Sequence, residues 1–220
     1  MIKKYLSYFL PVNIIKEPST ISHTLEISWN NGELVLDSKN TNYSYGSLQR
    51  ILRKGLKYIG YERIRKFKSV LVLGVAGGSV IKTLVEEIKF KGKITGVEID
   101  DKVVDLANQY FGLDKIRNLD LIVDDAFNFV LKSQETYDLI IIDIFQDTNM
   151  PSFLFQDYFI NRLHDILNIN GFILFNTMVI SKKDAERNQQ YKSKFGGNYS
   201  LRMYPKVEEH NELFTIKKLG

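Results

Sequence analysis

The apolar residues of this chain follow two different spacings. From residue 69 onward, short wholly apolar runs alternate with segments in which apolar residues recur every three or four positions. Short apolar runs between turn residues are typical of buried strands, and the wider spacing is typical of helices. The predicted strands are 70–73, 94–99, 119–123, 137–142 and 172–175. The predicted helices are 80–88, 103–110 and 155–167.

This order of elements predicts the fold class. Strands that alternate with helices pair in parallel through right-handed crossovers. We therefore expect an α/β fold with a Rossmann-like, doubly wound and mostly parallel sheet. Two β-rich runs, 199–207 and 212–217, flank His210-Asn211 near the end of the chain. They predict an antiparallel C-terminal hairpin that closes the sheet.

The first part of the chain has a different pattern. Segment 24–37 alternates apolar and polar residues on both sides of Asn30-Asn31-Gly32, and Asn-Gly readily takes the positive φ angles of a tight hairpin turn. A helix should follow, with apolar residues at helical spacing from Leu48 to Ile59 and its end at Gly60. We predict a small N-terminal β-rich unit over 1–47 and a Rossmann-like domain over 48–220. Exposed edges of the N-terminal unit would allow pairing into a homo-oligomer.

Composition excludes several classes of protein. Hydrophobic residues make up 44% and charged residues 25%, so the chain can build a full core. Cys is 0, which excludes disulfides, Cys-ligated zinc and a thiolate nucleophile. The three histidines show no ligand spacing, and no metal site is expected. No apolar run reaches the ~20 residues of a membrane span, so no membrane partner is expected. Residues 1–15 lack a signal-peptide cleavage pattern and suit a first strand or a docking segment, which points to a cytoplasmic protein.

The net charge of +4 does not by itself require nucleic acid as a partner. One segment is more basic than the rest, since residues 50–68 hold eight Lys or Arg and one acid, Glu62. Such a segment is usually a solvated helix face, and the alternative is a patch that faces an anionic substrate or RNA. Because the segment forms no recognisable motif of interleaved aromatic residues or of arginines, a nucleic-acid partner is not the expectation.

Ligands of a doubly wound sheet bind outside the carboxyl ends of its strands. The first predicted strand is followed by small residues that let backbone N–H groups approach a ligand, namely Gly74, Ala76, Gly77 and Gly78. The next three strands are followed by acidic residues, namely Glu98, Asp100, Asp101, Asp124, Asp125, Asp143 and Asp147. One of Asp100 and Asp101 is expected to cap the following helix instead.

The spacing of these residues indicates the kind of ligand. Glu98 lies 24 residues beyond Gly74, where a carboxylate accepts hydrogen bonds from both hydroxyls of a ribose. The turn lacks the G-x-G-x-x-G of dinucleotide sites and the chain lacks the G-x-x-x-x-G-K-[ST] of phosphate-binding loops. A phosphate-free nucleoside such as S-adenosylmethionine fits better, and its positive sulfonium suits an acidic pocket.

The stretches VLVLGVAGGSVIKTL, GVEID, VDDAFNFV and YDLIIIDIFQDT resemble the class I S-adenosylmethionine-dependent methyltransferase fold. They resemble more closely the spermidine synthase (polyamine aminopropyltransferase) family. The resemblance implies that Gly74, Ala76, Gly77 and Gly78 wrap the amino-acid part of the ligand. It implies that Glu98 and Ile99 hold the ribose side and that Asp125 and Ala126 contact the adenine. It further implies that Asp143, with Tyr45 opposite, faces the attacking amine.

Three features on the acceptor side depart from the family pattern. The aspartate of the family's glycine-rich turn is here Gly77, the D-S-x-D-P after the fourth strand is absent, and the Tyr-His-Glu of the N-terminal region is here Tyr45-Gly46-Ser47. The sequence therefore favours methyl transfer from S-adenosylmethionine to a small-molecule acceptor, with an amine as a candidate. Aminopropyl transfer from decarboxylated S-adenosylmethionine is the first alternative. A non-catalytic nucleoside-binding module is the second.

Overall fold

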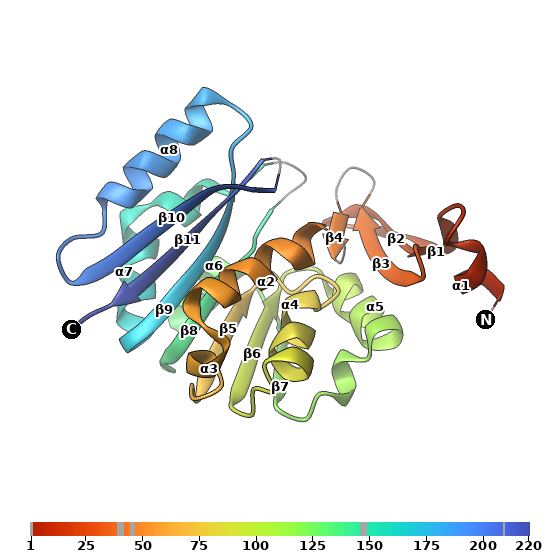
Figure 1. The fold of residues 1–220 in the computed structure, drawn as a ribbon, viewed down its shortest axis with the longest axis horizontal. Coiled ribbons are helices and arrows are strands. Elements are labelled where there is room, and N and C mark those ends of the chain that lie inside the picture. The colour runs from red at the N-terminus through yellow and green to blue at the C-terminus, as the bar shows by residue number, and fades with distance from the viewer. Residues whose placement is uncertain (1, 39–41, 45–46, 146–148, 209) are drawn as a thin grey trace.

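The computed structural model of the protein describes residues 2–38, 42–44, 47–145, 149–208 and 210–220. It contains a seven-stranded sheet with the order β10-β11-β9-β8-β5-β6-β7 (Figure 1). Four neighbouring pairs, from β9 to β7, are parallel, and the last two strands add to β9 in antiparallel fashion. The strands are β5 Ser69–Leu73, β6 Lys93–Glu98, β7 Leu119–Val123, β8 Tyr137–Ile142, β9 Leu167–Met178, β10 Tyr199–Glu208 and β11 Asn211–Lys218. The predicted fold class is confirmed, including the C-terminal hairpin.

Helices cover both faces of this sheet (Figure 1). Side chains on β5 alternate between the two faces: Val70 and Val72 pack in the core beneath α2 and α4, and Leu71 and Leu73 pack in the core beneath α6 and α7. Burial on both faces explains why this strand is wholly apolar. The helices are α2 Ser47–Ile59, α3 Tyr61–Ile64, α4 Ser79–Lys82, α5 Asp101–Phe111, α6 Ala126–Lys132, α7 Asp157–Ile166 and α8 Lys182–Ser193.

The N-terminal unit is a second, antiparallel sheet in the order β1-β2-β3-β4. Its predicted hairpin is confirmed, with Asn31 at φ 50° and Gly32 at φ 78° between β2 and β3. Both central residues of a tight hairpin turn need positive φ, which Asn and Gly tolerate. Its elements are α1 Ile2–Leu6, β1 Val12–Ser19, β2 His23–Asn30, β3 Glu33–Ser38 and β4 Asn42–Ser44. The domain boundary at residue 47 stays a prediction.

Several elements differ from the prediction in extent. The helix expected over 80–88 is α4 followed by a π-helical turn, Thr83–Glu87. The helix expected over 155–167 is a short 3-10 turn, Ser152–Phe155, followed by α7. The strand expected at 172–175 is the longer β9, which begins at Leu167.

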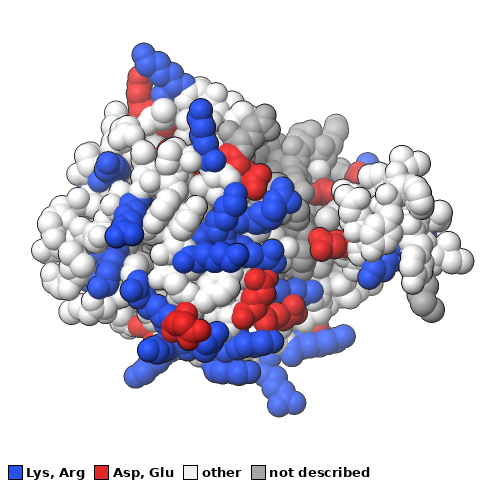
Figure 2. Space-filling view, viewed as in Figure 1, with Lys and Arg blue, Asp and Glu red and all other residues white. Residues whose placement is uncertain are grey.

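The basic segment 50–68 lies on α2, α3 and the turn that follows them. Figure 2 shows its blue side chains interleaved with red ones. Arg50 and Lys54 pair with Glu208, Arg53 pairs with Glu87, and Arg65 pairs with Glu62. These exposed ion pairs match a solvated helix face. Within the described residues, no helix is long and apolar enough to cross a membrane.

Candidate functional site

The predicted site residues that the structure describes lie at the carboxyl ends of four neighbouring strands, β8, β5, β6 and β7. Backbone hydrogen bonds join these strand ends directly. Asp143 N donates to Leu73 O over 2.9 Å, Gly74 N donates to Val97 O over 3.0 Å, and Asp124 N donates to the backbone oxygen of Glu98 over 3.0 Å. The glycine turn and the acidic residues therefore share one edge of the sheet, as the sequence predicted.

Gly74 and Asp143 are in direct backbone contact. Gly74 has φ +85°, and a Cβ placed on it would lie 2.3 Å from the carbonyl oxygen of Asp143. Only glycine fits this position, because any side chain would clash with the β8 backbone and strain its own. The glycine thus lets the end of β5 approach the end of β8 and fixes where Asp143 lies.

The other glycines of the turn are also buried. Gly78 has φ +77° and precedes α4, and a Cβ there would lie 2.5 Å from the side chain of Leu113. Ala76 adopts φ +50°, which is uncommon for a residue with a side chain. The turn therefore has a tightly constrained backbone shape, which suits a loop that presents N–H groups to a ligand.

The carboxylate of Glu98 is bound by the backbone on both of its oxygens. Oε2 accepts from Val75 N and Ala76 N, each over 3.0 Å, and Oε1 accepts from Ile99 N over 2.9 Å and Asp100 N over 3.3 Å. Burial raises the pKa of Glu98, and these four N–H donors act in the opposite direction. Glu98 thus ties the glycine turn to the end of β6, in addition to any contact with a ribose.

The predicted adenine side lies one strand further along. Asp125 caps α6 by accepting a 2.7 Å hydrogen bond from Phe127 N, and Ala126 is the first residue of that helix. Ile99, which follows Glu98, leaves 43% of its surface exposed at this edge. An exposed apolar side chain beside a helix start offers a surface for a flat base.

Asp143, like Glu98, is a carboxyl group at this edge with a raised pKa. Burial raises the pKa of Asp143 to about 6, nearby Glu98 also raises it, and a hydrogen bond from Asn176 lowers it. Asn176 Nδ2 donates to Oδ1 of Asp143 over 2.9 Å, and Oδ1 of Asn176 accepts from Asn211 Nδ2 over 3.1 Å. A carboxyl group with its pKa near neutrality is suited to exchange a proton with a bound amine.

Two residues of the predicted site lie outside the described residues. These are Tyr45, expected opposite Asp143, and Asp147, which follows β8. The expectation for Tyr45 stays a prediction.

Sequence reasoning missed the amides that support Asp143. Asn176 is fully buried at the carboxyl end of β9, and Asn211 begins β11 beside it. The sequence places Asn176 after the fifth predicted strand, which is the one signal that pointed to it. It gave no signal for Asn211.

A second missed contact joins the two sheets. Asp100 caps α5 through Lys102 N, and its other oxygen accepts hydrogen bonds from the hydroxyls of Ser19 over 2.5 Å and Ser22 over 2.7 Å. Ser19 ends β1 and Ser22 precedes β2. The N-terminal unit is therefore attached two residues from Glu98, next to the candidate site.

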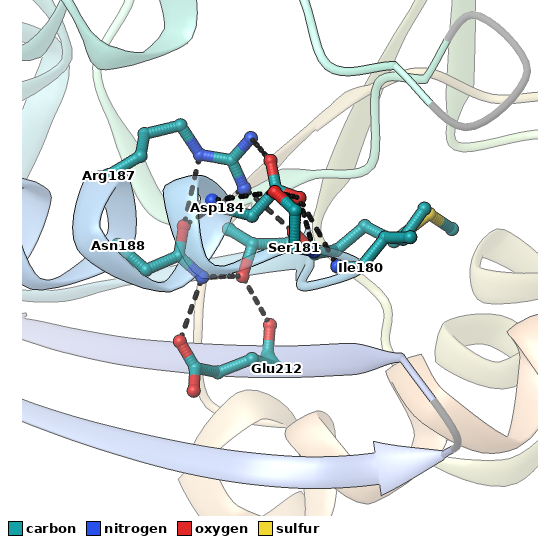
Figure 3. Close-up of polar contacts among 8 residues, drawn as sticks. Ile180, Ser181, Asp184, Arg187, Asn188 and Glu212 are labelled. Carbon is teal, nitrogen blue, oxygen red and sulfur yellow. Dashed lines mark hydrogen bonds and ion pairs between the residues drawn. The ribbon is translucent and has the colours of Figure 1, made fainter.

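A polar network fixes α8 against the end of β9 (Figure 3). Asn188 donates to Thr177 Oγ1 over 2.9 Å and to Glu212 Oε1 over 2.8 Å, and Arg187 donates to the backbone oxygen of Met178 over 2.7 Å. Thr177 follows Asn176 in β9, so its side chain lies on the opposite face of the sheet. The network therefore supports the strand that carries Asn176 from behind.

A cavity of about 540 Å³ lies away from this edge, at the amino ends of β5, β8 and β9. Asp138 lies in its wall, but this carboxylate is already bonded to the N–H groups of Lys68 and Ser69 and to Asn168. The cavity thus has no acidic group free for a cationic ligand and is not part of the candidate site.

The chain matches the family model "Spermine/spermidine synthase domain" over residues 51–218. It is 27% identical to the "Probable polyamine aminopropyl transferase" of Bifidobacterium longum over 221 residues, which cover 95% of this chain and 48% of that protein. It is 30% identical to the "Polyamine aminopropyltransferase" of Vibrio vulnificus over 142 residues, 63% of this chain and 47% of that protein. The chain thus spans about half the length of these curated relatives.

Solved structures show the same fold. Spermidine synthase from Thermotoga maritima aligns with a TM-score of 0.69 at 18% identity, over 95% of this chain and 73% of that one. Human methyltransferase-like protein 13, solved in complex with SAH, aligns with a TM-score of 0.66 at 19% identity, over 80% of this chain and 83% of that one. The fold expected from the sequence resemblance is confirmed.

Proposed function

The chain belongs to the spermine/spermidine synthase family, and from this premise we propose that it transfers an aminopropyl group to an amine. The donor would be decarboxylated S-adenosylmethionine and the second product methylthioadenosine. Support comes from the activity for which the relatives are named and from the position of Asp143. Among the hypotheses drawn from the sequence, these relatives favour aminopropyl transfer over methyl transfer.

The nucleoside end of the donor would lie along β5, β6 and β7. Glu98 would share its carboxylate between the backbone N–H groups that it already binds and the ribose hydroxyls. Asp125 and the N–H of Ala126 would lie at the adenine, and Ile99 would pack on the base. These roles match the hydrogen-bonding capacity of the protein groups. Carboxylates accept hydrogen bonds from hydroxyls and amino groups, and backbone N–H groups donate hydrogen bonds to ring nitrogens.

Asp143 would hold the acceptor. Its carboxylate is half-buried beside Glu98, so it attracts an ammonium more strongly than an exposed carboxylate does. The Asn176 amide keeps one oxygen of Asp143 oriented and leaves the other available. The geometry that carries the proposal is this oriented carboxylate next to the glycine turn.

The reaction needs an amine nucleophile, a carbon–sulfur bond of the donor aligned with that nucleophile, and a group that accepts one proton. The donor supplies a sulfonium, which leaves as a neutral thioether when its bond to the propyl carbon breaks. The amine nitrogen forms the new bond to that carbon, and Asp143 accepts the proton that the nitrogen loses. Holding both reactants in line contributes on the order of 7–11 kcal/mol to such a reaction.

Methyl transfer from S-adenosylmethionine is a second candidate function, and the residue that favours it is Gly77. The sequence resemblance places Gly77 where the family's turn carries an aspartate, so the group that would grip the aminopropyl amine is absent. A donor that retains its carboxylate would meet the backbone of Gly77 there, without a negative side chain to repel it.

A product assay separates these candidates. The full chain would be incubated with a diamine and either decarboxylated S-adenosylmethionine or S-adenosylmethionine. Methylthioadenosine from the first mixture supports the proposal, and S-adenosylhomocysteine from the second mixture alone would replace it with methyl transfer. A chain that binds either compound but yields neither product across amine acceptors would be the non-catalytic binding module.

A further inference from the structure

Three loops that lead into neighbouring strands share one short pattern of residues. In each loop an apolar residue lies between two cations: 66–68 (KFK) before β5, 89–91 (KFK) before β6 and 115–117 (KIR) before β7. The central apolar residue packs in or against the core beneath α2 and α4 in all three loops. It thus anchors the loop, while the cations on either side are exposed. We refer to these exposed side chains as the amino-edge cations: Lys66, Lys68, Lys89, Lys91, Lys115 and Arg117.

Backbone and side-chain hydrogen bonds hold the three loops side by side. Lys93 N donates to Lys68 O over 2.9 Å, and Ile94 N donates to the backbone oxygen of Asn118 over 2.8 Å. The side chain of Asn118 also donates to Gly92 O over 2.6 Å. Because β5, β6 and β7 are adjacent strands about 4.8 Å apart, the amino-edge cations form a row across the amino ends of the sheet. Figure 2 shows Lys and Arg side chains gathered along the lower margin of the molecule, where these strand ends lie in Figure 1.

The amino-edge cations lack acidic partners in the part of the chain that the structure describes. None of them forms an ion pair there, whereas Arg50, Arg53 and Arg65 of the basic segment 50–68 all do. Segments 66–69, 88–93 and 115–119 contain no Asp or Glu. Like charges held this close repel one another, and an anionic partner offsets the repulsion.

Two acids that adjoin the row are already bound. Glu135 pairs with Lys93, and Asp138 accepts hydrogen bonds from the backbone N–H groups of Lys68 and Ser69. They therefore leave the ammonium groups of the row available to a ligand.

One end of the row borders the cavity of about 540 Å³ at the amino ends of β5, β8 and β9. The cavity wall joins cations with apolar side chains and with side chains that donate and accept hydrogen bonds. Ile169, one of the apolar residues, is 64% exposed. Apolar faces beside amides and hydroxyls suit a nucleobase, which stacks through its face and forms hydrogen bonds through its edge. The wall includes Lys66, Phe67, Lys68, Thr136, Asn168, Ile169 and Asn170.

We propose that this amino edge of the sheet binds single-stranded nucleic acid. The amino-edge cations contact successive phosphates, and the cavity takes a base against Phe67 and Ile169. Proteins that bind single strands combine a positively charged track for the backbone with faces on which bases stack. The bases of a duplex are paired and stacked inside the helix, so they cannot enter the cavity. The candidate site lies at the opposite, carboxyl ends of the strands and stays open.

The sequence analysis did not expect a nucleic-acid partner, because segment 50–68 alone forms no recognisable motif. The row instead draws on three segments that are separated from one another by more than twenty residues. The parallel sheet brings them together, and the most basic part of segment 50–68 contributes only Lys66 and Lys68. The cations that led to the weaker expectation are largely those that pair with acids.

Other anionic partners fit the amino edge less well. A bilayer surface requires apolar side chains that enter the headgroup region, but Phe67, Phe90 and Ile116 of the three loops pack toward the core. A small anion would occupy one or two cations and leave the repulsion along the rest of the row. A chain of phosphates extends across all three strands.

Fluorescence anisotropy of a labelled oligouridylate of about 12 nucleotides tests the proposal with the full chain. We expect affinity to fall as salt rises, with a log–log slope of up to about −4 for six phosphate contacts. Lys68→Ala with Lys91→Ala should weaken binding at least about tenfold in 0.1 M salt and reduce the slope by about 1.4. Ile169→Ser should weaken binding about fivefold and leave the slope unchanged, because it removes a stacking face and no charge.

A charge-matched control separates this surface from general attraction to a basic protein. Lys182→Ala with Lys183→Ala removes two exposed lysines from α8 and should bind as the unchanged chain does. Equal weakening by the two double variants, or no binding of the oligouridylate, would overturn the proposal. Oligodeoxythymidylate of the same length distinguishes RNA from DNA as the source of the strand.

Two competitors test where the strand binds and what kind of partner the surface takes. Methylthioadenosine carries no phosphate and should not displace the oligouridylate, because we place it at the opposite edge of the sheet. Displacement by it would put the strand in the candidate site and overturn the proposal. Tighter binding of a duplex would overturn the role of the cavity, and tighter binding of an oligoglutamate of equal charge would assign the surface to an acidic protein instead.

Discussion

The side-chain amide of Asn176 donates a 2.9 Å hydrogen bond to the carboxylate of Asp143, across the neighbouring strands β9 and β8. Asn176 is in turn oriented by Asn211, whose amide donates to its oxygen over 3.1 Å. Three side chains separated by more than thirty residues along the sequence thus form one chain of hydrogen bonds. The carboxylate of Asp143, the group proposed to bind the acceptor amine, is thereby held in place by the C-terminal hairpin as well as by its own strand.

Replacing Asn176 should change the pH dependence of the reaction. The amide stabilises the charged form of Asp143, so Asn176→Ala should raise the pKa of Asp143 above about 6. The acid limb of kcat/KM against pH should then move upward by about one pH unit. Asn168→Ala is the matched control, because Asn168 bonds Asp138 over the same 2.9 Å at the opposite edge of the sheet. An unchanged limb in Asn176→Ala would remove Asp143 from the proton transfer.

Asp143→Asn should abolish activity and alter the pH dependence of stability. The folded chain retains a proton on Asp143 up to about pH 6, whereas the unfolded chain releases it near the ordinary pKa of 3.8. The free energy of unfolding contributed by this group therefore falls as pH rises between about 4 and 6. The variant should lack this loss, which amounts to about 3 kcal/mol by pH 7 for a pKa raised from 3.8 to about 6. Thermal unfolding at a series of pH values measures it, and parallel curves for the two proteins would contradict it.

Gly74→Ala should destabilise the protein and displace Asp143. The new methyl group would meet the carbonyl of Asp143 and would sit on a backbone with positive φ. We expect a loss of about 2–4 kcal/mol in the free energy of unfolding. Gly196→Ala is the control, since no atom lies within 4 Å of a Cβ there, and it should change stability by less than about 0.5 kcal/mol. Equal stabilities for the two variants would refute the close packing of β5 on β8.

Glu98→Ala should weaken nucleoside binding and also lower stability. Removing the carboxylate leaves four backbone N–H groups at the glycine turn without their acceptor. We expect a loss of order 2–4 kcal/mol in the free energy of unfolding. Calorimetry with methylthioadenosine should show at least about tenfold weaker binding, as one lost charged hydrogen bond costs that much. Glu135→Ala, which removes an exposed partner of Lys93, serves as the control and should affect neither. Unchanged affinity in Glu98→Ala would rule out the ribose role.

The contact between Asp100 and the N-terminal unit predicts a local effect. Ser19→Ala with Ser22→Ala removes both hydroxyls from the buried carboxylate of Asp100. Hydrogen exchange should become faster in β1 and β2 and stay unchanged in β5, because the lost bonds attach only the N-terminal unit. Ser193→Ala, on the exposed end of α8, should leave both regions unchanged. Uniformly faster exchange across the chain would mean that the contact stabilises the whole fold instead.

Much of the site edge followed from the sequence because parallel strands end at one edge of their sheet. Gly74, Glu98 and Asp143 each follow an apolar run, so a fold-class prediction alone brought them together. Asn211 could not be found in this way. Its contact with Asn176 depends on β11 lying antiparallel beside β9, and no local pattern encodes that pairing.

Elements that polar contacts hold in place could not be predicted from the spacing of apolar residues either. Helix α8 buries only Asn188 and Tyr191, so it has no apolar stripe, and its start is fixed by a capping box between Ser181 and Asp184. Strand β9 begins at Leu167, five residues before the predicted start. The prediction missed these residues because exposed positions between Leu167 and Gly171, among them Asn170 at φ 64°, interrupt the apolar run of the strand. The spacing of apolar residues thus predicts the elements that form the core. Elements held in place by hydrogen bonds can be identified only once the folded structure is known.

A crystal structure of the full chain with methylthioadenosine tests the central claim most directly. We expect the ribose hydroxyls within hydrogen-bond distance of Glu98, the adenine between Ile99 and Asp125, and the sulfur facing Asp143. A nucleoside bound instead in the cavity between Lys68 and Asn168, at the amino ends of the strands, would contradict it.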